Sequence, residues 1–493
     1  MIVRAPSLER ADRTALVVAS AAALAVGVLA AATTPLIPLA GLIGLLVLGL
    51  VWWRPIVGVW LFVGVVAVLP FGVIPVPLAG AQLTFVDAIM IATFSAVLGR
   101  WIFSRQWVAL TAPGIALLAF VLVCAAAFVA GASVSPITPE LIRRTGKLIA
   151  SVLFFIVAGS LLTTEARIAS ITRGLIVAGA IQGGIGAVLV RLDPLTQLTL
   201  LSRLSAIGYP TVDVLRYVPG ANDTYTSQLR AIGTSVDPNV FGGTLMLALV
   251  VILVQWASPR PVLRKSVLML LALPTAAGVL LSLSRASWAG LAVGLLFLGG
   301  LRYRRILVLA TLIGLATLAT PVGQSFVVRF VSGFSIADPA TAFRVGEYAN
   351  ALTLLTRYPV LGIGFGASPD IDVTAGVSSV YLLVGEQTGL LGLSAYLVAL
   401  VATWWIGFRG LRGMRDSRLL GMRAAFLAAF SGALVTGLLD HYFANEAFPH
   451  AVALFWLYAA VLVASARLES RQAEPERAAL TRSTTVRANV AAV

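Results

Sequence analysis

Apolar runs of close to 20 residues recur along the whole chain, separated by mostly short polar connections. A helical run of that length matches the roughly 30 Å hydrocarbon thickness of a membrane. Helices are expected because a helix satisfies its own backbone hydrogen bonds inside lipid. The pattern predicts an all-α, polytopic transmembrane bundle of about 14 spans, at 15–32, 36–53, 56–78, 84–102, 109–130, 148–163, 170–190, 239–257, 266–283, 286–300, 306–320, 379–407, 424–439 and 448–466.

The stretch 267–301 requires a decision about how many helices it contains. Arg285 is its only ionisable residue. As one helix the stretch would be about 50 Å long at 1.5 Å per residue, which is too long for a single crossing. Two short helices with Arg285 at the tip of the hairpin are predicted instead.

The polarity pattern also divides the chain into regions. The transmembrane domain covers 1–466, and the polar segment 467–493 is expected to be a disordered tail. Two of the connections are long: 191–238, and 321–378 between spans 11 and 12. Connections longer than about 15 residues are usually functional or disordered. Because these two contain aromatic, glycine and charged residues, function is favoured.

Composition and charge agree with this architecture. The chain is 59% hydrophobic and 11% charged, whereas soluble proteins carry about 25% charged residues. With the N-terminus in the cytoplasm and alternating sides, 24 of the 35 Lys and Arg residues fall inside. Lys and Arg in short loops set orientation. Both termini are therefore predicted to be cytoplasmic, in a bacterial inner membrane, with both long connections on the outer face.

Several classes of function lack support in the sequence. The net charge of +15 comes from residues that flank the membrane, so a nucleic-acid partner is not expected. Cys124 is the single cysteine, and His441 and His450 are the only histidines. No HExxH motif, GxSxG elbow or phosphate-binding P-loop occurs. Neither a metal nor another cofactor is predicted.

The first long connection ends in a polar segment that runs directly into a predicted span. Asp237, followed by Pro238 and Asn239, has the pattern of a helix start, with a capping carboxylate and then proline at the first helical position. Asp237 is therefore interpreted first as a cap, and Asn239 as a residue that shapes the site. Arg230 has no such structural explanation, although contact with a lipid headgroup is an alternative.

The hairpin around Arg285 carries the second candidate. An ionisable group so near hydrocarbon is costly and normally needs an anionic partner. Snorkelling to the interface is one reading. The other is a phosphate clamp, because the planar guanidinium matches phosphate oxygens bidentately.

A third group of basic residues lies at the predicted outer end of the sixth span. Arg143, Arg144 and Lys147 run against the charge rule there, which suggests an anionic partner or a headgroup contact. Asp87 is an acidic residue predicted within the span 84–102, and a structural role against a polar neighbour is favoured for it.

The second long connection contains a predicted amphipathic helix over 343–357, stopped by Pro359. Arg344 and Glu347 fit either a functional role or a weak i,i+3 surface pair. The glycine-rich run that follows, around Gly364, has the wrong spacing and context for a nucleotide site, and is interpreted as a flexible or close-packed loop.

Four segments in this region resemble, in order, motifs of O-antigen ligases and polymerases. Arg230 through Phe241 is similar to a G-x-x-x-D/N-P-N-x-F/Y stretch, and Ser282 through Arg285 to an S-x-S-R hairpin. Arg344 through Gly366 resembles an R…P-x-x-G-x-G-x-G loop, and 377–393 resembles H-N/S-x-Y-L…E-x-G-L-L-G-L. The resemblance covers about 230–395, roughly a third of the chain.

The resemblance implies a membrane glycosyltransferase. Such enzymes take a glycan from a polyprenyl pyrophosphate on the outer face and join it to a hydroxyl of a lipid or glycan acceptor, without metal and with inversion. By family position, Arg230, Arg285 and Arg344 would hold the pyrophosphate, and three separate guanidinium groups suit a leaving group that gains negative charge. We add Arg143, Arg144 and Lys147 as further donor-binding candidates, and Asp237, Asn239, Gly364 and Glu386 as site-shaping residues.

One position departs from the family. Ligases place a histidine where this chain has Ser378, and a serine hydroxyl alone is no general base near neutral pH. His441, Asp440, Glu347 or Glu386 could replace it, so the catalytic candidates are His441, Asp440, Glu347 and Ser378. Polymerase is therefore slightly favoured over ligase.

Two other functions compete with this one. A transporter or flippase of an anionic solute or lipid-linked glycan would place its binding groups near the membrane midplane, whereas the charges here concentrate at one face. A cell-wall glycan polymerase of the shape-and-division class ranks last, because its motifs are not found. Membrane lipids are expected partners, and the sequence does not indicate an oligomeric state.

Overall fold

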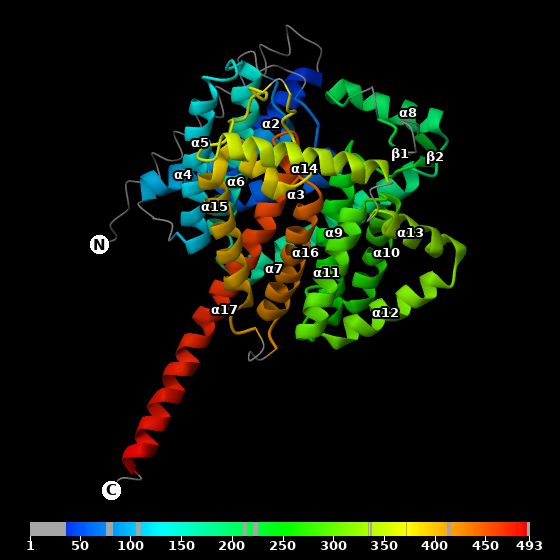
Figure 1. Ribbon diagram of the computed structural model, residues 1–493. Helices are drawn as coiled ribbons and strands as arrows, with labels where there is room; N and C mark the ends of the chain where they lie inside the picture. The colour runs from blue at the N-terminus through cyan, green and yellow to red at the C-terminus, as the bar shows by residue number, and fades with distance from the viewer. Residues whose placement is uncertain are drawn as a thin grey trace.

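The structure, a computed structural model, is a bundle of helices with one small β-hairpin at its edge (Figure 1). It describes residues 36–74, 82–104, 110–210, 214–219, 225–333, 335, 338–370, 372–411 and 416–490. The helices that fall on predicted spans are α2 (Leu36–Trp53), α3 (Ile56–Val68), α4 (Phe85–Ser104), α5 (Ala112–Gly131), α6 (Pro139–Leu161), α7 (Glu165–Leu189), α9 (Pro238–Ala257), α10 (Lys265–Leu281), α11 (Arg285–Leu301), α12 (Arg304–Leu318), α15 (Val380–Phe408), α16 (Arg418–Leu439) and α17 (Pro449–Val490).

The helices confirm a multi-pass membrane protein. The number of about 14 spans stays a prediction. Seven described helices are long and apolar enough to cross a membrane, and four more are apolar but shorter. The predicted span 15–32 lies outside the described residues. The predicted span 56–78 is too long, because α3 ends at Val68. Pro70 follows two residues later, and the residue before a proline is disfavoured in a helix.

The hairpin predicted over 267–301 is confirmed. Helix α10 ends at Leu281 and α11 begins at Arg285. Between them Leu283 takes a left-handed φ of 52°, a backbone conformation that reverses the chain and is uncommon for a residue with a branched side chain. Ser284 then caps α11 by accepting a hydrogen bond from the Ser287 N–H.

Both long connections are structured. The first contains α8 (Pro194–Ser202), a 3-10 turn (Arg203–Ile207) and an antiparallel hairpin of β1 (Tyr217–Pro219) and β2 (Tyr225–Leu229). The second contains α13 (Pro321–Ser332) and α14 (Pro339–Arg357), which confirms the predicted amphipathic helix and its end before Pro359. The small hairpin is the one departure from an all-α fold among the described residues.

Burial separates central from peripheral helices. About 83% of the apolar stretch of α9 is buried inside the protein, and 89% of the apolar stretches of α16 and α17. The buried share is about a third for α4, α5 and α15. The peripheral helices leave large apolar side chains such as Leu122 exposed, as expected for surfaces that face lipid. Helices α9, α16 and α17 therefore form the core that positions the functional end.

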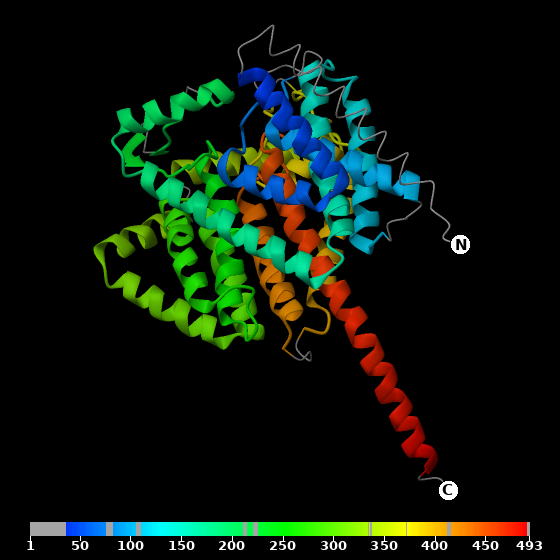
Figure 2. The ribbon, with the colours of Figure 1, turned by 180° about the vertical axis from the view of Figure 1, so that it is seen from behind.

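The last segment differs from the expected disordered tail. Helix α17 continues to Val490, and Figures 1 and 2 show its second half projecting from the bundle as a single helix. Ala, Glu and Arg, which are strong helix formers, are frequent in this segment. The low hydrophobicity of 467–493 predicted disorder, whereas the helical propensity of its residues accounts for the helix. Residues 491–493 lie outside the described part.

Candidate functional site

Segments distant in sequence meet at one end of the bundle. The N-termini of α9, α11 and α15 and the turn between α16 and α17 lie at this end, and α14 crosses over it (Figure 1). The Tyr348 hydroxyl of α14 donates to the carbonyls of Leu438 (2.8 Å) and Ser378 (3.2 Å). These two bonds attach α14 to the end of α16 and to the start of α15.

Asp237 is a helix cap, as predicted. Its carboxylate accepts hydrogen bonds from the N–H groups of Asn239 (2.7 Å) and Val240 (3.0 Å), with Pro238 at the first helical position. Val236, immediately before it, has a φ of 62°. Left-handed backbone is strained for a β-branched residue and occurs most often at functional sites. The start of α9 is therefore held in a specific, costly conformation.

Arg230 lies against the start of α9. Its Nε donates to the Ser282 carbonyl (2.9 Å) and its Nη2 to the Asn239 side-chain oxygen (2.6 Å). Burial, followed by the charges of Arg329 and Arg344, lowers the pKa of Arg230 to about 10, while Asp237 and Asp440 act in the opposite direction. Arg230 thus remains a cation at neutral pH, oriented by neutral oxygens.

Arg285 has a carboxylate partner that the sequence analysis missed. Its Nη2 lies 2.8 Å from Asp338 Oδ2, at the start of α14. Burial alone would raise the pKa of Asp338, but the hydrogen bonds and charge of Arg285, together with Thr341, lower it overall. Arg329 of α13 lies within electrostatic range of both Arg285 and Asp338. The anionic partner that an ionisable group at this position needs is therefore supplied by the chain itself.

Arg344 and Glu347 do not pair with each other. Glu347 Oε2 accepts a hydrogen bond from the Ser378 N–H (3.1 Å). Within the described part of the chain, Arg344 makes no hydrogen bond or ion pair, and it lies within electrostatic range of Arg230 and Asp440. The alternative of a weak i,i+3 surface pair is therefore wrong, because the two residues have separate surroundings.

Asp440 and His441 form a pair in the turn between α16 and α17. Asp440 Oδ1 accepts from the His441 N–H (2.9 Å) and lies 3.4 Å from His441 Nδ1, and Asp440 is 4% exposed. Burial raises the pKa of Asp440, although the charges of His441 and Arg344 oppose it. Asp440 Oδ2 is buried, and no described residue hydrogen-bonds to it.

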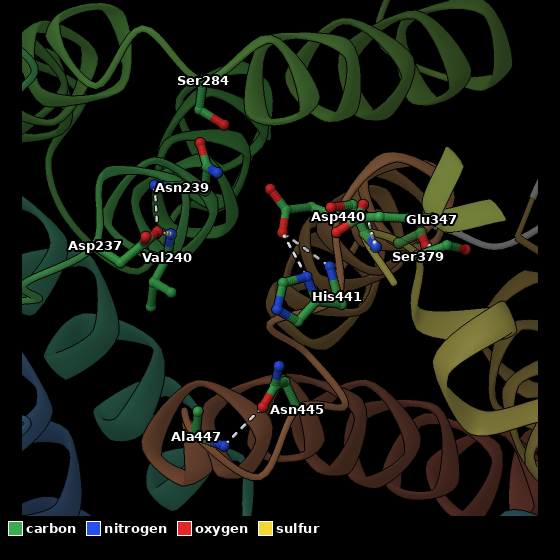
Figure 3. A network of polar contacts seen from close by, with 12 residues as sticks. Asp237, Asn239, Val240, Ser284, Glu347, Ser379, Asp440, His441, Asn445 and Ala447 are labelled. Atoms are coloured by element: carbon green, nitrogen blue, oxygen red, sulfur yellow. Dashed lines mark hydrogen bonds and ion pairs between the residues drawn. The ribbon is translucent and has the colours of Figure 1, made fainter. Parts of the chain in front are cut away.

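Figure 3 shows how this pair lies in the site. Asp440 and His441 project between α9 and α11, which carry Asn239 and Ser284, and α14, which carries Glu347. Of the four predicted catalytic residues, His441, Asp440 and Glu347 therefore come together. Ser378 joins them through its backbone, by the Glu347 and Tyr348 hydrogen bonds.

The third basic group is paired with carboxylates within the protein. Arg143 and Arg144 contact Glu140 at 2.5 and 2.6 Å, and Lys147 lies 2.6 Å from Asp87. Hydrogen bonds, that of Arg144 first, lower the pKa of Glu140. The structural role predicted for Asp87 is confirmed. The anionic partner that the sequence suggested for these three cations is supplied by two side chains of the chain itself.

Gly364 and Glu386 shape the loop between α14 and α15. Gly364 has a φ of 79°, and a Cβ there would lie 2.9 Å from the Ala127 carbonyl oxygen of α5. Glu386 Oε1 accepts from the Gly376 N–H (2.8 Å), and its carbonyl accepts from Ile363 N–H. The loop is close-packed, as one of the two predicted readings had it.

Two residues of this end escaped the sequence analysis besides Asp338. Arg329 lies on α13, outside every motif, and Glu446 follows His441 in the α16–α17 turn. Burial raises the pKa of Glu446 to about 7, opposed by Arg144 and reinforced by Glu140. No three His, Cys, Asp or Glu side chains among the described residues lie close enough to hold a metal ion.

Comparison with known proteins adds one match. The family model described as O-antigen ligase matches residues 267–397. That range contains Arg285, Arg344, Glu347, Ser378 and Glu386, whereas Arg230 and the Asp440–His441 pair lie outside it. No curated protein matches the chain. The matched segment, which carries the hairpin and the α14–α15 loop of the site, is thus similar to the O-antigen ligase family.

Proposed function

We propose that the protein is a membrane glycosyltransferase that joins or polymerises glycans from a polyprenyl-pyrophosphate donor, on the outer face of the cytoplasmic membrane. One observation carries the proposal: Arg230 and Arg344, which no described carboxylate pairs by a salt bridge, lie with the buried Asp440–His441 pair. An anion site beside a candidate base is the arrangement that transfer from a diphosphate requires.

The arginines would hold the donor. Guanidinium groups bind phosphate oxygens bidentately, so Arg230 and Arg344 would each donate hydrogen bonds to the diphosphate. Arg285 is not counted with them, because Asp338 already lies 2.8 Å from its guanidinium. Electrostatic stabilisation of a departing diphosphate grows as its charge develops, which lowers the barrier to transfer. Arg143, Arg144 and Lys147 are left out of this set because each already contacts a carboxylate, Glu140 or Asp87.

The Asp440–His441 pair would activate the acceptor. Asp440 Oδ1 lies 3.4 Å from Nδ1, near enough for its charge to stabilise the imidazolium that forms when Nε2 accepts a proton. The acceptor hydroxyl oxygen attacks the anomeric carbon as its proton passes to Nε2. The bond from that carbon to the phosphate oxygen breaks, and polyprenyl pyrophosphate leaves. Attack opposite the leaving group inverts the anomeric centre without a metal ion.

This assignment accounts for Ser378. The family resemblance places a histidine at that position, where the backbone N–H contacts Glu347. His441 lies in the turn between α16 and α17. Its partner Asp440 lies within electrostatic range of Arg344 and Tyr348, which belong to α14, the helix that carries Glu347. The imidazole would thus reach the same space from a different segment, and acceptor chemistry would survive the loss of the family histidine.

The test uses the purified full chain in proteoliposomes with a polyprenyl-pyrophosphate-linked glycan and an acceptor glycan. His441→Ala is expected to reduce transfer by about 100- to 10,000-fold, the usual contribution of a general base, and His441→Gln should not restore it. Unchanged transfer in both variants would overturn the proposal. Substrate counterflow without any transfer would favour the alternative, a transporter or flippase.

A further inference from the structure

A basic pocket lies at the opposite end of the bundle from the candidate functional site. It encloses about 480 Å³ between the ends of α4, α6, α7 and α17. Four arginines line it: Arg100, Arg167, Arg467 and Arg471. Helix α17 begins beside the candidate site at Pro449, and Arg467 follows about 27 Å further along at 1.5 Å per residue. The two sites are therefore separated by nearly the thickness of a membrane.

The charge of this pocket is not balanced from within. None of its lining residues is acidic. Among the described side chains nearby, two acidic residues pair elsewhere: Glu469 with Arg423 at 2.8 Å and Glu165 with Arg418 at 3.8 Å. Arg167 instead donates to the Leu161 carbonyl and to Thr163 Oγ1, both at 3.0 Å. Neutral oxygens thus orient the Arg167 guanidinium. An anion would balance the charge of the four arginines, and phosphate is an anion that guanidinium groups bind bidentately.

An apolar groove continues from the pocket. Leu110, Phe155, Ile156, Ala460 and Val463 line it between α5, α6 and α17. The groove and the pocket share four lining residues, which are Gly159, Ser160, Ala464 and Arg467. The side chain of Phe103 at the nearby end of α4 is 84% exposed, as a side chain that meets lipid can be. The ligand that matches both parts has a phosphate head and a hydrocarbon chain.

We propose that the pocket and groove together bind one anionic phospholipid. Its phosphate contacts the four arginines, and one acyl chain lies in the groove along α6 and α17. Basic pockets between helix ends recruit anionic lipid headgroups from the adjacent leaflet. The bound lipid would join α4, α6, α7 and α17 at this end. The proposal does not depend on glycan transfer, and binding of the lipid measures it without any assay of that reaction.

The experiment measures lipid binding to the detergent-purified full chain by native mass spectrometry and by the shift in melting temperature. Phosphatidylglycerol should bind and raise Tm, and phosphatidylcholine should do neither. The Arg467→Gln/Arg471→Gln double variant should bind phosphatidylglycerol about 30-fold more weakly, from about fivefold for each arginine.

A second variant tests the groove without touching the charges. A Cβ built on Gly159 meets open space, with no atom within 4 Å outside its own helix backbone. Gly159→Leu therefore places a branched side chain at the junction of pocket and groove and should abolish the Tm shift. Arg173→Gln, an exposed arginine on α7 outside the pocket, is the matched control and should bind as the wild type does. Wild-type binding in both the double variant and Gly159→Leu would overturn the proposal. So would an equal Tm shift with inorganic phosphate, which would show an anion site without a lipid.

Discussion

Two groups of basic residues at the same end of the bundle have opposite surroundings. Arg143, Arg144 and Lys147 each contact a carboxylate at 2.5–2.6 Å. Arg230, by contrast, is held by an amide oxygen and a carbonyl. A cation that already has a carboxylate partner gains little from an added phosphate, since the two anions compete for one charge. The difference teaches that the partner of a basic residue, and not its predicted side of the membrane, identifies an anion site.

If Arg230 and Arg344 can be removed without an effect on glycan transfer, the difference between the two basic groups has no functional meaning. The Arg230→Ala/Arg344→Ala double variant is expected to lose about 100- to 1,000-fold in kcat, because it removes charge that stabilises the departing diphosphate. The rate of glycan transfer in proteoliposomes measures it, and Arg143→Ala/Arg144→Ala is the matched control. Similar losses in the two double variants would contradict the distinction. Arg230→Lys should restore part of the rate, because it keeps charge but loses the bidentate geometry.

The paired group should instead affect stability. Lys147→Met leaves Asp87, whose side chain is 9% exposed, without its cation. Removing one member of a buried pair is costly, and we expect a loss of about 2–3 kcal/mol with transfer retained in the folded fraction. Thermal unfolding measures the loss. The Asp87→Leu/Lys147→Met double variant should recover most of it, and a double variant as unstable as the single one would contradict the pairing.

Glu446 sharpens the comparison, because it lies within electrostatic range of Arg144 and Glu140 while belonging to the turn of His441. Burial raises its pKa from 4.5 to about 7 in the folded protein. The protonated carboxyl therefore stabilises the fold at low pH, and this stabilisation is lost as the pH rises from 4.5 through about 7. Tm measured from pH 5 to 7.5 should fall less in Glu446→Gln than in the wild type. Equal slopes would show that Glu446 ionises normally.

The smallest effect is expected at the exposed end of the paired group. Arg143→Ala removes a contact between side chains that are 39% and 45% exposed. Exposed pairs contribute about 0–1 kcal/mol, and Arg144 still contacts Glu140 in this variant. Unfolding should shift by less than about 1 kcal/mol, and transfer should stay within about twofold. A larger loss of transfer would return Arg143 to the donor site.

Local features of the fold could be predicted from the sequence. Hydrophobic length places the α10–α11 hairpin, and an amphipathic pattern ended by Pro359 places α14. Asp237 followed by Pro238 predicts the start of α9. These depend on neighbours in the chain, so local rules suffice. The end of α3 and the helical continuation of α17 were missed because apolar length alone does not mark where a helix stops.

The pairing of charges could not be predicted, because the partners are distant in sequence. Asp338 reaches Arg285 from another helix, and Asp87 reaches Lys147 from another span. The family resemblance identified Arg230, Arg285 and Arg344, and the gap at Ser378 led to His441 and Asp440 as candidates. Asp440 and His441 face Arg230 and Arg344 because of how α9, α14 and α16 pack. No local sequence pattern encodes that packing.

The turn that carries His441 joins α16 and α17, the two most deeply buried long helices of the bundle. Such a turn has little freedom to shift when a bulky sugar chain arrives. Adjustment to acceptors of different size therefore falls to the covering segment of α13 and α14, which Tyr348 and Asp338 fasten at two points. Among homologues, differences in the acceptors they use should therefore come with sequence changes in α13 and α14, while the turn between α16 and α17 stays the same.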